Sequence, residues 1–84
     1  MNSKHQKTLV AIFDEPVRSN VKWADIEKLF AACGAEISEG RGSRMRVSLN
    51  DIDAVFHRPH PKPDTDKGAL KSVRRFLEMA GVNP

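Results

Sequence analysis

The stretch from residue 44 to residue 57 constrains the fold most, because apolar side chains recur at every second position in its first half and a turn signal follows. Over 44–49 this alternation is typical of a strand with one buried face. Asn50-Asp51 predicts a two-residue hairpin turn, so that 52–57 forms the next strand. In that register Arg44 lies across from His57, on the face away from the core. The expected apolar pairs are Leu49 with Ile52, Val47 with Ala54, and Met45 with Phe56.

Apolar residues at intervals of three and four predict two helices before residue 35. The first is expected from Thr8 and must end before Pro16, while residues 1–7 are expected to fray. The second is expected from Trp23 to Gly34, because glycine favours the left-handed conformation that closes many helices. The expected buried stripe of this second helix is Trp23, Ile26, Leu29, Phe30 and Cys33.

Residues 35–38 alternate between apolar and polar, which predicts a short strand ahead of the hairpin. We interpret the glycine-rich segment 40–43 as a turn, because it is too short for a phosphate-binding loop. Prolines hold 58–63 extended, and 64–66 offer caps for a last helix that ends at Gly81. The expected buried stripe of this helix is Leu70, Val73, Leu77 and Ala80.

The expected order is therefore helix, helix, three antiparallel strands and helix, in one domain spanning residues 1–84. Helices on one face of a small sheet give an α+β domain of two layers. Apart from the first short helix, this is the α-β-β-β-α order of a double-stranded-RNA-binding domain. The single cysteine, Cys33, cannot form an internal disulfide, and the chain shows no signal peptide and no apolar run of membrane length. We therefore expect a cytoplasmic protein.

His57 and His60 lie close together in sequence, just ahead of a basic helix. Metal-free RNA cleavage needs a base for the 2′-hydroxyl proton, an acid for the leaving oxygen and positive charge for the phosphate. Histidine suits the first two tasks, and arginine or lysine the third. For the basic residues an ordinary solvated surface is the other interpretation. The candidate RNA-binding residues are Arg46, Arg58, Lys67, Lys71, Arg74 and Arg75, the last four being expected together on the outer face of the helix.

Several short motifs follow one another in a familiar order. They are Trp23-Ala24-Asp25-Ile26-Glu27-Lys28-Leu29, Gly34, Gly42-Ser43, Arg58-Pro59-His60 and Lys67-Gly68-Ala69-Leu70-Lys71-Ser72. Together they resemble the HicA family of bacterial type II toxins over roughly Val21 to Val82. The resemblance implies a small toxin that cleaves mRNA, has a double-stranded-RNA-binding-like fold, and is held inactive by a HicB antitoxin covering its active face.

The chain departs from the family pattern at one place. The pattern carries a catalytic histidine directly after Gly-Ser, where this chain has Arg44, and arginine stays protonated near neutral pH. Our hypothesis is that His57 substitutes as its cross-strand neighbour, with Arg44 clamping the phosphate and His60 as the second histidine. The alternative interpretation of His57 is a half-exposed strand residue without a role, and that of His60 is a solvated loop residue. The alternative function of the whole protein is a non-catalytic module that binds RNA or antitoxin.

Neither a metal nor a small-molecule cofactor is expected. The histidines are few, and no acidic residue recurs at the spacing of metal ligands. Cys33 belongs to an apolar stripe, which favours a buried thiol over a nucleophile. Trp23 is interpreted as a core residue, and His5 lies in the segment expected to fray.

Overall fold

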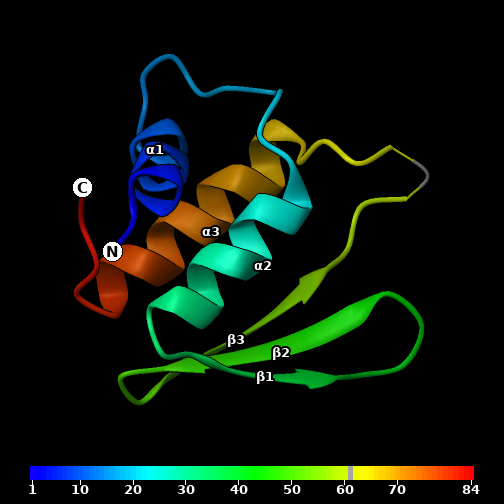
Figure 1. Ribbon diagram of the computed structural model, residues 1–84. Coiled ribbons are helices and arrows are strands. Elements are labelled where there is room, and N and C mark those ends of the chain that lie inside the picture. Colours follow the sequence, from blue (N-terminus) through cyan, green and yellow to red (C-terminus); the bar gives the residue numbers. More distant parts are fainter. Residues whose placement is uncertain (61) are drawn as a thin grey trace.

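The computed structural model describes residues 1–60 and 62–84, in which three helices pack on one face of a three-stranded sheet (Figure 1). Within these residues, the other face of the sheet carries no helix. This arrangement confirms the α+β, two-layer class and the α-β-β-β-α order after an extra N-terminal helix. The elements are α1 (Ser3–Ile12), α2 (Trp23–Ala32), β1 (Glu36–Glu39), β2 (Arg44–Leu49), β3 (Ile52–His57) and α3 (Lys67–Met79).

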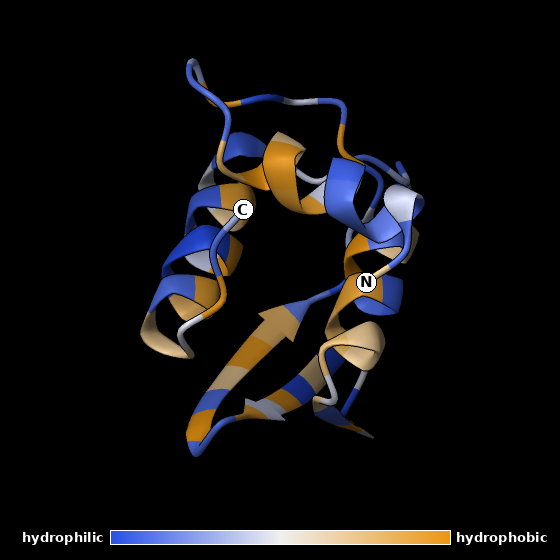
Figure 2. Cartoon of the chain, turned by 60° about the vertical axis from the view of Figure 1, so that its left-hand side comes forward, coloured by the Kyte–Doolittle hydropathy of each residue, from blue (hydrophilic) through white to orange (hydrophobic). Residues whose placement is uncertain are grey.

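The sheet is antiparallel in the order β1-β2-β3, and the predicted register of its hairpin is confirmed. Asn50 and Asp51 have φ angles of 50° and 67°, the left-handed values that a tight two-residue hairpin requires. Leu49 pairs with Ile52, and five further pairs follow down to Arg44 opposite His57. Hydrophobic and hydrophilic residues alternate along β2, whereas the nearest strand in Figure 2, β3, has a continuous hydrophobic stretch over residues 54–56.

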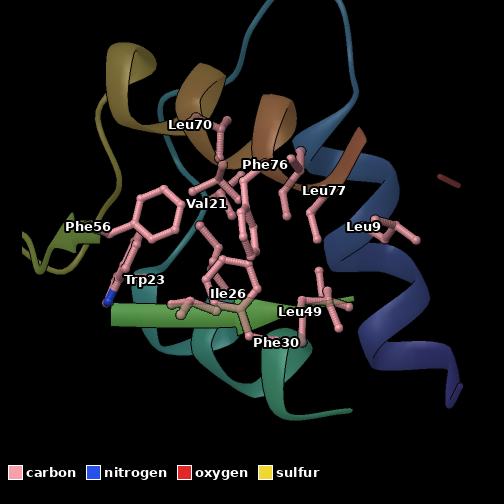
Figure 3. Packing of buried hydrophobic residues seen from close by; sticks show 14 of the residues in the cluster. Leu9, Val21, Trp23, Ile26, Phe30, Leu49, Phe56, Leu70, Phe76 and Leu77 are labelled. Carbon is pink, nitrogen blue, oxygen red and sulfur yellow. The ribbon is translucent and has the colours of Figure 1, made fainter. Parts of the chain in front are cut away.

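The core lies between the helices and the sheet and is centred on four aromatic rings (Figure 3). Phe30 stacks on Phe56 at 5.7 Å between ring centroids, and Phe76 meets both rings edge-on. Trp23 packs on Phe56 at 5.8 Å, so its interpretation as a core residue is confirmed. Phe76, a central member of this cluster, was missing from the predicted stripe of the last helix. Cys33, the last member of the second stripe, is only half-buried.

The first helix begins at Ser3, so the expectations of a start at Thr8 and of fraying across 1–7 were wrong for most of that segment. The Asn2 side chain accepts a hydrogen bond from the backbone N–H of His5 at 2.9 Å, which caps a helix turn that has few apolar residues. The predicted end before Pro16 is confirmed, because α1 stops at Ile12.

The ends of the other helices follow the predicted capping. Gly34 has a φ of 87° directly after α2, a conformation that costs glycine little. The Asp66 side chain accepts from the Ala69 N–H at 2.8 Å and starts α3, which ends ahead of Gly81. None of the helices that the structure describes has the length and hydrophobicity needed to cross a bilayer.

Candidate nucleic-acid interface

The uncovered face of the sheet carries the residues singled out from the sequence. Met45 is completely buried against the helices, so its neighbours Arg44 and Arg46 must project from the opposite face, where both are exposed. His57 pairs with Arg44 across β2 and β3 and is also exposed. The pairing expected from the register is thus present, and it places an imidazole beside a guanidinium on the open face.

A depression of about 260 Å³ lies next to this pair and is rich in arginine. We call it the arginine hollow, and its one acidic lining residue, Glu39, is paired with Arg58. The other lining residues are Ser38, Gly40, Arg41, Arg44, Met45, Arg46 and Val55. Within the described part of the chain, none of its three arginines forms an ion pair. The sequence argument missed Arg41, although its position in a glycine-rich turn between two strands was the available signal.

Gly40 stands where the turn comes closest to Arg44. A Cβ at residue 40 would lie 3.0 Å from the Cβ of Arg44, closer than such atoms normally approach. The Gly40 N–H also donates to the Arg44 carbonyl at 2.9 Å, which closes the turn over the strand. The segment 40–43 is therefore a turn, as interpreted from the sequence, and it brings Arg41 to the hollow.

The opposite end of the open face is acidic. A second depression of about 420 Å³ lies beside the hairpin turn, and its charged lining residues are Glu36, Asp51 and Asp53. The Ser48 hydroxyl donates to the Asp53 carboxylate there. The sheet face therefore changes from negative at the hairpin to positive at the arginine hollow, which favours a polyanion at one end only.

Arg58 lies on the helix side of the sheet, where it holds three elements together. Its guanidinium pairs with Glu27 of α2 at 2.9 Å and with Glu39 at the end of β1. Hydrogen bonds from Arg58 lower the pKa of the Glu39 carboxyl. In return, hydrogen bonds to Glu39, and to a lesser extent to Glu27, raise the pKa of the Arg58 guanidinium. Arg58 is thus engaged within the protein, although the sequence argument assigned it to RNA.

The segment that carries His60 is fixed at both ends. At its start the Arg58 N–H donates to the Ser43 carbonyl at 2.9 Å, which joins it to the β1–β2 turn. At its end Pro63 and Thr65 form backbone hydrogen bonds to the residues that precede and start α2. His60 is exposed between these anchors. In Figure 1 residues 58–60 and the β1–β2 turn extend toward the same end of the molecule.

The four basic residues of α3 do not form the single outer face expected from the sequence. Lys67, Lys71 and Arg75 are exposed, whereas the Arg74 side chain is only 17% exposed. Arg74 donates to the carbonyls of Ile12 and Asp14 at 2.9 and 2.8 Å and pairs with Glu15, and so fastens α3 to the end of α1. Of the other three, Arg75 approaches β3.

Burial raises the pKa of the Cys33 thiol, which favours its protonated and unreactive form. Among residues 1–60 and 62–84, no three histidine, cysteine or acidic side chains gather as a metal site would require.

Comparison with known proteins identifies the family. The family model described as HicA toxin of bacterial toxin-antitoxin matches residues 23–82, from the start of α2 through the sheet to just past α3. The chain belongs to the HicA toxin family. The match confirms the resemblance drawn from the motifs and makes this protein a toxin of a toxin–antitoxin system, in a family whose members act on RNA. Neither the comparison with curated proteins nor that with solved structures gave a match.

Proposed function

We propose that this HicA protein is an endoribonuclease that cleaves mRNA in the cytoplasm and is neutralised by a HicB-type antitoxin. The observation that supports it best is the pairing of His57 with Arg44 on the uncovered sheet face. It puts an imidazole, a group that can accept or donate a proton, next to a fixed positive charge. The neighbouring arginine hollow offers further positive charge for phosphate.

In the proposed reaction His57 accepts the proton of a ribose 2′-hydroxyl. The 2′-oxygen attacks the adjacent phosphorus and forms a 2′,3′-cyclic phosphate, while the bond from phosphorus to the 5′-oxygen breaks. His60 donates a proton to that leaving oxygen. Arg44 neutralises the charge that grows on the non-bridging oxygens in the transition state. No metal or small-molecule cofactor takes part in this scheme.

In this scheme the RNA runs along basic residues that form no ion pair within the part of the chain that the structure describes. We assign Arg41 and Arg46 to the phosphates beside the reacting one, because both line the arginine hollow. Lys67, Lys71 and Arg75 on α3 extend the positive surface beyond the sheet. Arg58 and Arg74, which bind other parts of the protein, act in this scheme by fixing the segments around them.

An antitoxin would use the same positive charge. The exposed guanidinium groups of the hollow could form ion pairs with carboxylates on an antitoxin, just as they could with the phosphates of RNA. Antitoxin and RNA would then compete for one surface, and the toxin would stay inactive while the antitoxin is bound.

One observation favours a second function. Arg44 occupies the position at which the family pattern carries its histidine, and arginine cannot act as a base near neutral pH. A protein with this change and no substitute base would bind RNA or antitoxin without cleaving.

The two functions are separated by inducing the protein in a bacterial host and following growth and total RNA. We expect wild-type protein to arrest growth and degrade mRNA, and His57→Ala and His60→Ala to lose both effects. His5→Ala is the matched control, because His5 lies in α1 and away from the sheet. RNA that stays intact with soluble, folded wild-type protein would establish the binding module instead.

A further inference from the structure

We propose that the free edge of β3 is a docking site where an extended, acidic segment of another protein adds as a fourth strand. β3 is the last strand in the order β1-β2-β3, so one side of its backbone has no strand partner among residues 1–60 and 62–84. Figure 2 shows β3 as the strand nearest the viewer, with α3 beside it. Exposed edges of this kind are used by proteins that bind peptides through backbone hydrogen bonds.

The register identifies the free backbone groups. A two-residue hairpin closes with a hydrogen-bonded pair, here Leu49 and Ile52, and such pairs then alternate along the ladder. Counted in steps of two from Leu49 and Ile52, these pairs reach Ser43 and Arg58. The Arg58 N–H does donate to the Ser43 carbonyl, at 2.9 Å. The N–H and C=O groups that point to the free edge therefore belong to Asp53, Val55 and His57.

A groove lies between this edge and α3. It measures about 220 Å³, and its walls include Ala54, Val55, Ser72, Arg75, Phe76 and Met79. Met79 is 60% exposed and Val55 52%, and both of these large apolar side chains line the same groove. An added strand would place alternate side chains over this groove, so the same feature supplies backbone pairing and apolar contact.

Charge decides which occupant suits the groove. Asp53 and Arg75 both line it, and Lys71 is exposed on the preceding turn of α3, so the α3 wall of the groove is positive and favours a segment with acidic side chains. Pairing with a second copy through β3 would bring two basic α3 helices together on one side of the joined sheet. None of the four residues of β1, the outer strand on the other side, is basic: Glu36 carries negative charge, and Glu39 already pairs with Arg58. The proposal rests on the sheet edge and the groove beside it, and it stands whether or not the protein cleaves RNA.

The test is a titration of isotope-labelled full-length protein, followed by amide NMR. The probe is a short blocked peptide with threonine at every second position. Leucine, glutamate and leucine occupy the positions between, so that one face of the extended peptide carries the apolar and acidic groups. We expect the largest shifts at the amides of Asp53, Val55 and His57. The same peptide with N-methylated backbone nitrogens on its pairing side should not bind, because it lacks the donors that join the strands.

Charge reversal gives the matched controls. Arg75→Glu should weaken binding of the glutamate peptide about tenfold at low salt and favour a lysine version of it. Lys67→Glu changes the net charge equally but lies outside the groove, and should have a much smaller effect. The proposal is overturned by no binding to wild type, by shifts confined to β1, or by equal binding of the N-methylated peptide. It is likewise overturned if a single-stranded RNA oligonucleotide shifts these amides and the peptide does not.

Discussion

Arginine has two separate tasks in this molecule, and the acceptors within reach of each side chain decide between them. Arg58 meets Glu27 and Glu39, and Arg74 meets two carbonyls and a carboxylate near the end of α1. Arg44 and Arg46 face solvent on the open side of the sheet. Substitution of the first pair should therefore act on the fold, and substitution of the second pair on binding to phosphate.

We predict that the stabilisation from Arg58 is lost in acid. The folded-state pKa of Glu39 is lowered by its bond to Arg58, so this contribution is complete above the ordinary glutamate pKa of about 4.3 and falls as pH drops through the lowered value. In urea unfolding, Arg58→Met should be less stable than wild type at pH 7, and the gap should narrow by about pH 3. A gap that is constant between these pH values would show that the ion pair contributes nothing.

The hairpin of β2 and β3 is the element on which the site depends, because its turn sets which residue faces His57. Asn50 and Asp51 both adopt left-handed angles, and the Asn50 amide also donates to the Ala80 carbonyl at 2.7 Å. The turn is thereby tied to the end of α3. A shift of the β2–β3 register by one residue would move Arg44 and Arg46 to the buried face, and the arginine hollow would be lost.

We predict opposite effects of two substitutions at Asp51. Asp51→Gly should stabilise the protein by about 0.5 kcal/mol, because glycine adopts a φ of 67° at little cost. Asp51→Ala should destabilise it by about 0.5–1 kcal/mol, because alanine resists that conformation and lacks the local hydrogen bonding of aspartate. Urea unfolding of both variants measures this. Two changes of the same sign would contradict the assigned turn.

These elements also show how far the sequence could be used for prediction. The hairpin was predictable because successive side chains of a strand point to opposite faces of the sheet, so only two registers of burial are possible. The turn residues select the one that buries the apolar side chains. The partners of Arg58 and Arg74 were not predictable, because Glu27 is 31 residues from Arg58 and Glu15 is 59 from Arg74. Sequence spacing placed Arg74 on a helix face but gave no information on the end of α1 beside it.

At the scale of the whole molecule, charge is distributed unevenly over the uncovered sheet face. Arg41, Arg44 and Arg46 gather at one end, while Glu36 and Asp53 lie at the other. The net charge of +3 conceals this division. A bound RNA strand should therefore leave the sheet before the hairpin turn and continue toward the basic residues of α3.

We predict that this uneven charge determines the salt dependence of RNA binding. Removing one phosphate contact should reduce the slope of log K against log salt by about 0.7 for single-stranded RNA. Arg46→Ala should show that reduction, whereas Arg74→Met should keep the wild-type slope, because its side chain is engaged with α1. Fluorescence anisotropy over a range of salt concentrations gives the slopes. Equal slopes for wild type and Arg46→Ala would remove Arg46 from the RNA path.

The central claim, that His57 acts as the base of an RNA-cleaving site, is tested most directly by cleavage of single-stranded RNA with purified protein and a metal chelator. We predict products with 2′,3′-cyclic phosphate ends, and a rate that falls by about 10²–10⁴-fold in His57→Ala but not in His5→Ala. Undiminished cleavage by folded His57→Ala, or no cleavage by folded wild type, would contradict the claim.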